Sequence, residues 1–120
     1  TYGGNTVKVE IEMSVGDYLD RLSILKIKEE KGLDVKEELQ YYHHRLITLD
    51  DGHDYYLNII KAINLQLWDL EDAKRKGVER YSKKESDTAF LITQLNDLRH
   101  ETKKRIDVYF GSDFTEKKSH

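Results

Sequence analysis

Apolar residues recur at alternating intervals of four and three along two long stretches of the chain, and this spacing constrains the fold most strongly. It is the spacing of side chains that share one face of an α-helix. The 120 residues contain no proline, the residue that most strongly disrupts a helix interior. We therefore predict an all-α chain, folded as an antiparallel bundle of about four helices.

Capping residues and glycines predict where these helices begin and end. The predicted helices cover about residues 14–31, 34–49, 54–76 and 82–110. Ser and Asp cap helix N-termini, and glycine readily adopts the left-handed conformation that ends many helices. The capping residues are Ser14 and the pairs Asp34–Glu37 and Ser82–Glu85, and the closing glycines are Gly32, Gly77 and Gly111. Short connections favour antiparallel packing of the second helix against both the first and the third.

Each predicted helix carries one apolar face, which indicates the side that packs into the core. The faces of the second and third helices follow a heptad-like spacing. The four predicted faces are Val15, Tyr18, Leu19, Leu22 and Leu25; Val35, Leu39, Tyr42, Leu46 and Leu49; Tyr56, Ile60, Ile63, Leu67 and Leu70; and Leu91, Leu95, Leu98, Ile106 and Tyr109.

The N-terminal segment has a different pattern. Apolar and polar residues alternate along Thr6–Met13, which predicts a short β-strand or an extended arm. A single strand needs a partner, so it would pair with another copy or lie along the bundle. We therefore expect an N-terminal arm over residues 1–13, a helical bundle over 14–111 and a polar tail over 112–120.

Composition narrows the classes of function. The absence of cysteine excludes disulfides, thiolate chemistry and cysteine-ligated zinc. The net charge of −3 makes a nucleic-acid partner an unfavoured interpretation. No apolar run reaches the ~18 residues that span a bilayer, so we expect no membrane partner. With no signal-like N-terminus, the expected location is the cytoplasm of a cell, or of a host if the protein is viral.

Polar residues form a stripe along the third predicted helix. Asn64, Trp68, Glu71 and Arg75 are spaced by four, three and four, so they share one face, and Asp72 lies beside them. The stripe borders the apolar face of the same helix. It is interpreted either as an ion-pair network between helices or as a surface that contacts a ligand.

A second stripe lies on the fourth predicted helix. Asn96, Arg99 and Lys103 share a face, with Asp97 adjacent. If the two stripes face each other, Glu71 and Asp72 would meet Arg99 and Lys103. Such a cluster is either a closed structural network or a site for an anion, because the arginine guanidinium matches carboxylate and phosphate groups.

Acidic residues raise the question of magnesium. All-α nucleotide pyrophosphohydrolases hold Mg²⁺ with a Glu-Glu-x-x-Glu pattern on one helix and an acidic pair three residues apart on another. Here Glu29 and Glu30 lack the third carboxylate, and only Asp69 and Asp72 have the second spacing. No cofactor is evident from the sequence, and Mg²⁺ belongs only to an enzymatic interpretation.

Three of these segments together resemble a family of small bacterial and phage proteins known only as a domain of unknown function. The resemblance covers about residues 9–120, with Asp17 in place of glutamate, His120 in place of an aromatic residue and a poor match over 33–55. The matching motifs are Ser14–Asp17 with Asp20–Lys28, Asn64–Arg75, Asn96–Arg99 with Lys103 and Ile106, and Gly111–Ser112 with Glu116–Ser119.

The resemblance implies a role for the residues that carry it, though it supplies no activity. Genes of this family often lie near surface-polysaccharide genes. The implied ligand-binding residues are Asp20, Lys28, Asn64, Trp68, Glu71, Asp72, Arg75, Asn96, Asp97, Arg99 and Lys103.

Two hypotheses for function follow. The first is a non-enzymatic binding or assembly module, a homo-oligomer and most simply a dimer, with the arm Thr6–Met13 and exposed tyrosines at its interface. The second is a small enzyme or ligand-binding protein with a site between the first, third and fourth helices. There Asp20, Glu71 and Asp72 would serve as acid, base or Mg²⁺ ligands. Lys28, Arg75, Arg99 and Lys103 would contact an anionic, for example phosphorylated, metabolite.

Overall fold

The computed structural model describes residues 13–46, 52–76 and 83–111. They form four helices, α1 (Val15–Glu30), α2 (Lys36–Leu46), α3 (Gly52–Arg75) and α4 (Lys83–Tyr109). These ranges contain no β-strand. The predicted all-α bundle of four helices is therefore confirmed. The predicted arm Thr6–Met13, except for Met13 itself, and the tail over 112–120 lie outside the described residues.

The predicted start of α1 and the predicted ends of α1 and α4 are confirmed, whereas α2 and α3 each begin two residues away from the predicted Asp34 and Asp54. Ser14 caps α1, accepting a hydrogen bond from the backbone N–H of Asp17 at 3.1 Å. Gly32 and Gly111 follow α1 and α4 with φ angles of 88° and 69°, which glycine adopts without strain. Asp34 makes a longer contact of 3.5 Å with the N–H of Lys36, and α2 begins there. Gly77, Ser82 and the side chain of Glu85 lie outside the described part.

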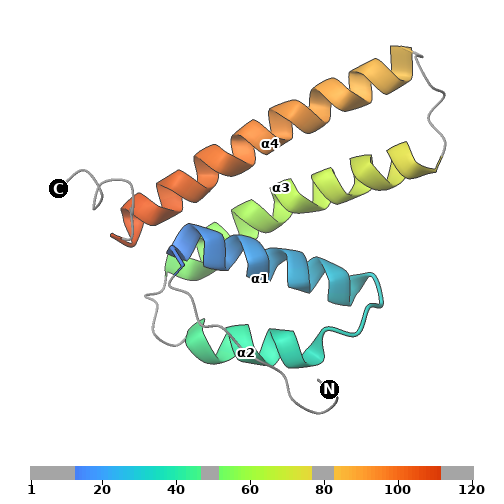
Figure 1. Cartoon of the computed structure of the whole chain (residues 1–120). Helices are drawn as coiled ribbons and strands as arrows, with labels where there is room; N and C mark the ends of the chain where they lie inside the picture. The colour runs from blue at the N-terminus through green and yellow to red at the C-terminus, as the bar shows by residue number, and fades with distance from the viewer. Residues whose placement is uncertain (1–12, 47–51, 77–82, 112–120) are drawn as a thin grey trace, which may run out of the picture.

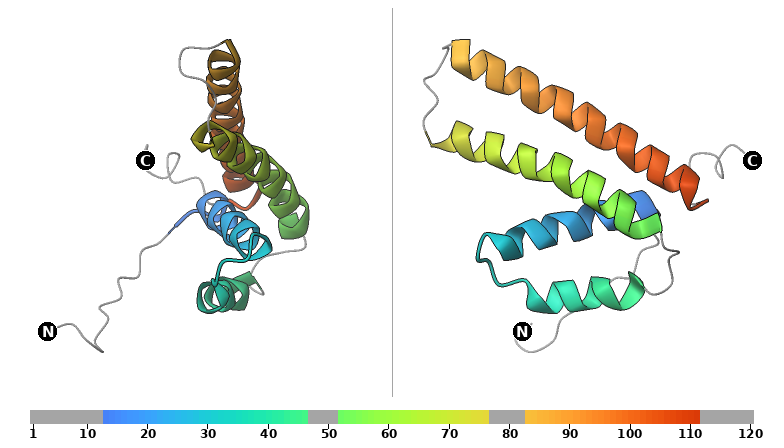
Figure 2. Two further views of the ribbon diagram at one scale, coloured as in Figure 1. Left: turned by 90° about the vertical axis from the view of Figure 1, so that its right-hand side faces the viewer. Right: turned by 180° about the vertical axis from the view of Figure 1, so that it is seen from behind.

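Helix α1 is the centre of the bundle. It packs against α2 on one side and against α3 and α4 on the other (Figure 1). Helices α3 and α4 run antiparallel. The C-terminal end of α3 and the N-terminal end of α4 project beyond α1, and we call this part the α3–α4 extension (Figures 1 and 2). The predicted packing of the second helix against the third is wrong, because α1 lies between α2 and α3.

The core gathers where α1 meets its neighbours. The predicted faces of α1, α2 and α3 supply most of it, together with Leu57, which was not predicted. The main buried cluster consists of Leu19, Leu22, Leu25, Val35, Leu39, Leu57, Ile60 and Ile106. Ile63 and Leu67 on α3 are also buried. Leu49 and the side chain of Leu46 lie outside the described residues.

The predicted apolar face of α4 is largely exposed. Ile106 is fully buried, but Leu91, Leu98 and Tyr109 are 45%, 50% and 50% exposed. For Leu91, the reason is that the N-terminal half of α4 extends past α1 and pairs with α3 alone, so this side chain lacks a second covering helix (Figure 1). Within the described ranges, no helix combines the length and apolar character that a membrane crossing needs.

Helices α1 and α4 approach each other closely at Gly16. Its backbone N–H donates to Asp107 Oδ1 at 2.6 Å. A Cβ atom placed on Gly16 would lie 2.5 Å from the carbonyl oxygen of Lys103 and 2.7 Å from Asp107 Oδ1. The absence of a side chain at this position therefore allows the two backbones to touch.

We predict that Gly16→Ala destabilises the protein by about 1–3 kcal/mol, the usual range for overpacking a filled contact. The clash is with backbone, so it outweighs the gain in helix propensity of up to about 1 kcal/mol. Urea unfolding measures the change. Gly52→Ala is the control, because the atoms nearest to its Cβ would belong to the half-exposed ring of Tyr109, which can move. Equal stability changes in the two variants would contradict the prediction.

Candidate functional site

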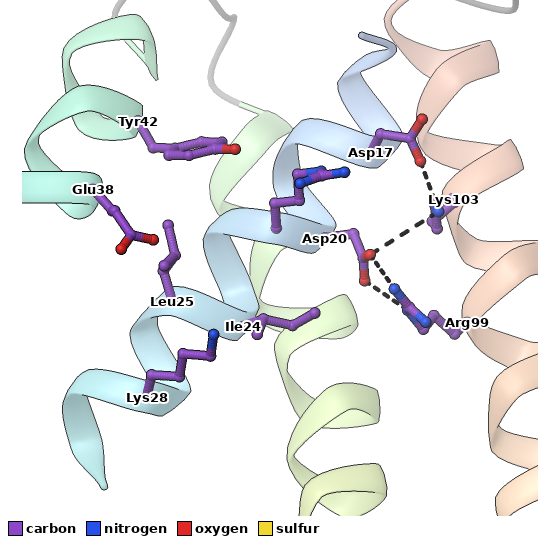
Figure 3. A pocket seen from close by; sticks show the side chains of 10 residues that line it. Asp17, Asp20, Ile24, Leu25, Lys28, Glu38, Tyr42, Arg99 and Lys103 are labelled. Carbon is purple, nitrogen blue, oxygen red and sulfur yellow. Dashed lines mark hydrogen bonds and ion pairs between the residues drawn. The ribbon is translucent and has the colours of Figure 1, made fainter. Parts of the chain in front are cut away.

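A buried aspartate on α1 connects three helices. Asp20 is 3% exposed. Arg99 of α4 donates two hydrogen bonds to its carboxylate, from Nε to Oδ1 at 2.8 Å and from Nη2 to Oδ2 at 2.5 Å (Figure 3). Asn64 of α3 donates a third, from Nδ2 to Oδ1 at 2.8 Å. One carboxylate thus ties α1 to both α3 and α4.

A serine one turn along α1 completes this network. Ser23 is fully buried. Its Oγ donates to the main-chain oxygen of Asp20 at 2.6 Å and accepts from Asn64 Nδ2 at 2.8 Å. The sequence analysis did not select Ser23. The available signal was a hydroxyl residue inside an apolar helix face, three residues after an aspartate, where it can bond to the preceding turn.

The partners of Asp20 keep it ionised. Burial alone would raise the pKa of the Asp20 carboxyl. The hydrogen bonds from Arg99 and Asn64, and the positive charges of Arg99 and Lys103, outweigh that effect and hold its pKa below the ordinary value. The hydrogen bonds to Asp20 raise the pKa of Arg99 in turn. Both groups are charged at neutral pH, and neither exchanges a proton readily.

Lys103 forms a further contact between α4 and α1. Its Nζ lies 2.6 Å from Asp17 Oδ1 and 4.0 Å from Asp20 Oδ2 (Figure 3). The prediction that Arg99 and Lys103 would meet Glu71 and Asp72 is therefore wrong. The acidic partners come from α1, because its first two turns pack directly against the C-terminal half of α4.

Asp72 instead pairs within its own helix. Its carboxylate lies 3.0 Å from Lys76 Nζ and 3.8 Å from Arg75 Nη2. The hydrogen bond from Lys76 lowers the pKa of Asp72. These contacts are near the surface, where water and salt screen ion pairs, so they contribute little to stability. Asp72 and the exposed Asp97 line neither of the pockets described next.

A pocket of about 390 Å³ lies between α1, α2 and α4, and we call it the basic pocket (Figure 3). Its uncharged lining includes Ile24, Leu25 and Tyr42. Four cationic side chains face three carboxylates there, so the lining carries a net charge of +1. The charged residues are Arg21, Lys28, Arg99 and Lys103, with Asp17, Asp20 and Glu38.

A second pocket, of about 310 Å³, lies between α1, α3 and α4, and we call it the Trp68 pocket. Ile24, Ile27 and Leu67 form apolar parts of its wall. Its polar lining consists of Asn64, Trp68, Glu71, Arg75, Asn96 and Arg99. Ile24 and Arg99 line both pockets, so the two share a boundary at the ion pair of Arg99 with Asp20.

The structure therefore gathers the residues selected from the sequence around two adjoining pockets, with Asp72 and Asp97 as exceptions. Asp20, Lys28 and Lys103 line the basic pocket, and the stripe from Asn64 to Arg75 lines the Trp68 pocket. The sequence analysis missed Arg21. The available signal was its position seven residues before Lys28, which places both cations on one side of α1.

The described residues contain no group of three histidine, aspartate or glutamate side chains placed to hold a metal ion. Asp20 is surrounded by donors, and Asp72 by cations of its own helix, whereas hard cations such as Mg²⁺ require oxygen ligands. The Mg²⁺ interpretation stays a prediction.

Comparison of the chain with protein-family models, with curated proteins and with solved structures found no match. The family resemblance of the motifs accordingly stays a prediction.

We predict that Asp20→Asn lowers the free energy of unfolding by about 2–3 kcal/mol. Breaking a fully buried ion pair costs about 3–5 kcal/mol, and the 25% exposure of the Arg99 side chain reduces this. Denaturant unfolding followed by circular dichroism is the measurement. Asp17→Asn is the matched control, since Asp17 is half exposed and its pair should contribute about 1 kcal/mol or less. Equal losses would show that Asp20 has no special structural role.

The lowered pKa of Asp20 predicts a dependence of stability on pH. A carboxyl group whose pKa is lower in the folded than in the unfolded state stabilises the fold above its unfolded pKa. That contribution disappears as the pH falls from the ordinary value of 3.8 toward the lower folded pKa. We expect the stability difference between the native protein and Asp20→Asn to be constant near neutral pH and to shrink below a pH of about 3.8. A difference that grows in acid would contradict this.

Proposed function

We propose that the protein is a helical binding module that holds a small anionic molecule in the basic pocket. One observation carries the proposal. Arg21 and Lys28 line this pocket, and neither side chain has a hydrogen-bond or ion-pair partner among the residues that the structure describes. Cations that line a pocket without a partner are available to a ligand.

The other two cations of the basic pocket have a different role. Arg99 is engaged by Asp20, and Lys103 by Asp17. These pairs fix the wall of the pocket that α4 contributes. A preorganised wall favours binding, because little side-chain freedom is lost when the ligand arrives.

Arg21 and Lys28 indicate the chemistry of the ligand. The planar guanidinium of Arg21 can donate two parallel hydrogen bonds to a carboxylate or phosphate, and Lys28 adds a point charge. Their negative counterpart in the pocket is Glu38, whose side chain likewise has no partner among the described residues. A phosphate or carboxylate group that also presents a hydroxyl or N–H group to Glu38 fits this arrangement.

We propose binding and not catalysis, because Asp20 is ionised and already hydrogen-bonded within the protein. Both of its carboxylate oxygens accept hydrogen bonds from within the protein, and its pKa is lowered. A general acid or base needs a pKa near the working pH. We therefore assign Asp20 to positioning Arg99. The ligand-binding residues that the resemblance implies also line the two pockets, apart from Asp72 and Asp97, which supports a shared binding role.

We predict that inorganic phosphate or pyrophosphate raises the thermal stability of the native protein and that the double variant Arg21→Gln/Lys28→Gln loses this response. A ligand at 100 times its Kd adds about 2.7 kcal/mol to the folded state. Differential scanning calorimetry at matched ionic strength measures the effect. Lys26→Gln is the control, since it removes a positive charge from the same helix at a residue that lines neither pocket. An equal response in native and double-variant proteins would reject the basic pocket as the site.

Exposed apolar side chains on α4 favour a second candidate function, self-assembly. On α4, Phe90, Leu91 and Leu98 are 62%, 45% and 50% exposed. A groove of about 500 Å³ between α3 and α4 is lined by leucines and glutamines, with Asp69 as its charged residue. We infer that a second copy of the chain covers this groove. Two such faces can meet in a symmetric dimer with few like charges opposed. The exposed Tyr41 and Tyr55 remain the other predicted contacts.

We predict a dimeric mass by light scattering after size-exclusion chromatography. The double variant Leu91→Gln/Leu98→Gln should shift the mass to that of a monomer and leave the helical content unchanged, since both side chains are about half exposed. Val108→Gln is the matched control, because Val108 is exposed on the same helix and lies outside the groove. A strictly monomeric native protein would rule out this candidate.

A further inference from the structure

We propose that the anionic ligand is a nucleotide, with its phosphate in the basic pocket and its heteroaromatic base in the Trp68 pocket. The phosphate half of this inference rests on the proposed function. The base half rests on the Trp68 pocket, for which the proposed function has no use.

The Trp68 pocket has the size and lining of a site for a flat ring. Its volume of about 310 Å³ is at the lower end of the range for small-molecule sites. The indole of Trp68 and the aliphatic Ile27 and Leu67 line it. A nucleobase presents two apolar faces to such walls and stacks well on indole. A sugar ring would instead bring hydroxyl groups against aliphatic carbon, where they lack hydrogen-bond partners.

Polar groups that line the Trp68 pocket are available to the edge of a base. Among the described residues, none provides a side-chain hydrogen bond or ion pair for Trp68, Glu71 or Asn96. The Glu71 carboxylate only accepts hydrogen bonds, so it requires a ligand N–H or O–H group, and the Asn96 amide both donates and accepts. Alternating donors and acceptors of this kind occur on the edges of nucleobases. Glu71 therefore favours bases that carry an exocyclic amino group.

The shared boundary connects the two halves of the ligand. Ile24 and Arg99 line both pockets. Arg99 uses Nε and Nη2 to hold Asp20, and no described residue accepts a hydrogen bond from its third nitrogen, Nη1. The Arg99 side chain is 25% exposed. It can donate from Nη1 to the sugar or phosphate oxygens of a ligand that reaches from one pocket into the other.

The experiment compares ligands that contain one or both halves. Isothermal titration calorimetry is run with adenosine and guanosine 5′-monophosphates, with ribose 5-phosphate and with the two nucleosides. Stacking on an aromatic side chain strengthens binding by about 5- to 150-fold per base, so the better nucleotide should exceed ribose 5-phosphate by a factor in this range. Trp68 is the one tryptophan of the chain, so the same titrations should change its fluorescence.

Variants separate the base subsite from the phosphate subsite. Trp68→Leu should reduce the affinity for the nucleotide to that for ribose 5-phosphate and leave the affinity for ribose 5-phosphate unchanged. Tyr109→Leu, at an aromatic residue that is 50% exposed and lines neither pocket, should change neither affinity. Glu71→Gln provides a second test of the base subsite, because this exposed residue can be changed without disturbing the core.

Each result has one meaning. Nucleotide and ribose 5-phosphate binding with equal affinity would overturn the base subsite and leave the anion site standing. Nucleosides binding as tightly as nucleotides would show that the basic pocket does not take the phosphate, and would overturn the spanning arrangement. If none of these ligands binds, the nucleotide inference is overturned, and the phosphate and pyrophosphate titrations then decide the anion site separately.

Discussion

The hydrogen-bonded ion pair between Asp20 and Arg99 is the interaction on which the arrangement of the helices depends. An ionised carboxylate at 3% exposure is tolerated only with its partners in place. Those partners come from α3 and α4, so the three helices must take one relative position for Asp20 to be satisfied. The close approach at Gly16, one turn earlier on α1, fixes the distance between α1 and α4 next to this ion pair. Both pockets border the contact between these helices.

Local features of the sequence were sufficient to predict the helices, and features that depend on packing order were not. Ser14, Gly32 and Gly111 end helices through their own backbone chemistry, so their roles could be predicted. Periodicity gave the apolar face of α4, but it carries no information on whether another helix covers that face. Leu91 and Leu98 are exposed for this reason. Likewise, the stripes of α3 and α4 were correctly identified as polar, but their partners could not be predicted. Both α1 and α3 pack against α4, so whether Arg99 pairs with Glu71 or with Asp20 depends on the relative position of the three helices, which periodicity does not give.

The two pockets contain paired charges and charges without a partner among the described residues, and this division supports a binding role. Arg99 and Lys103 are held by carboxylates of α1 and form fixed walls. Arg21, Lys28 and Glu71 line the pockets without partners among the described residues. In a purely structural network, charges pair with one another. Here, opposite charges are left in adjoining pockets, with an aromatic surface in one of them. This distribution suits a ligand that is anionic at one end and flat at the other.

The most direct test of this account is a double-mutant cycle on Asp20 and Arg99, measured by urea unfolding of Asp20→Asn, Arg99→Met and the double variant. Residues in direct contact within a network show coupling energies of about 0.5–3 kcal/mol. We expect a coupling in the upper half of that range, with Arg99→Met less destabilising in the Asp20→Asn background than in the native protein. A coupling near zero would mean that the two side chains stabilise the fold independently. Another interaction would then have to set the relative position of α1 and α4.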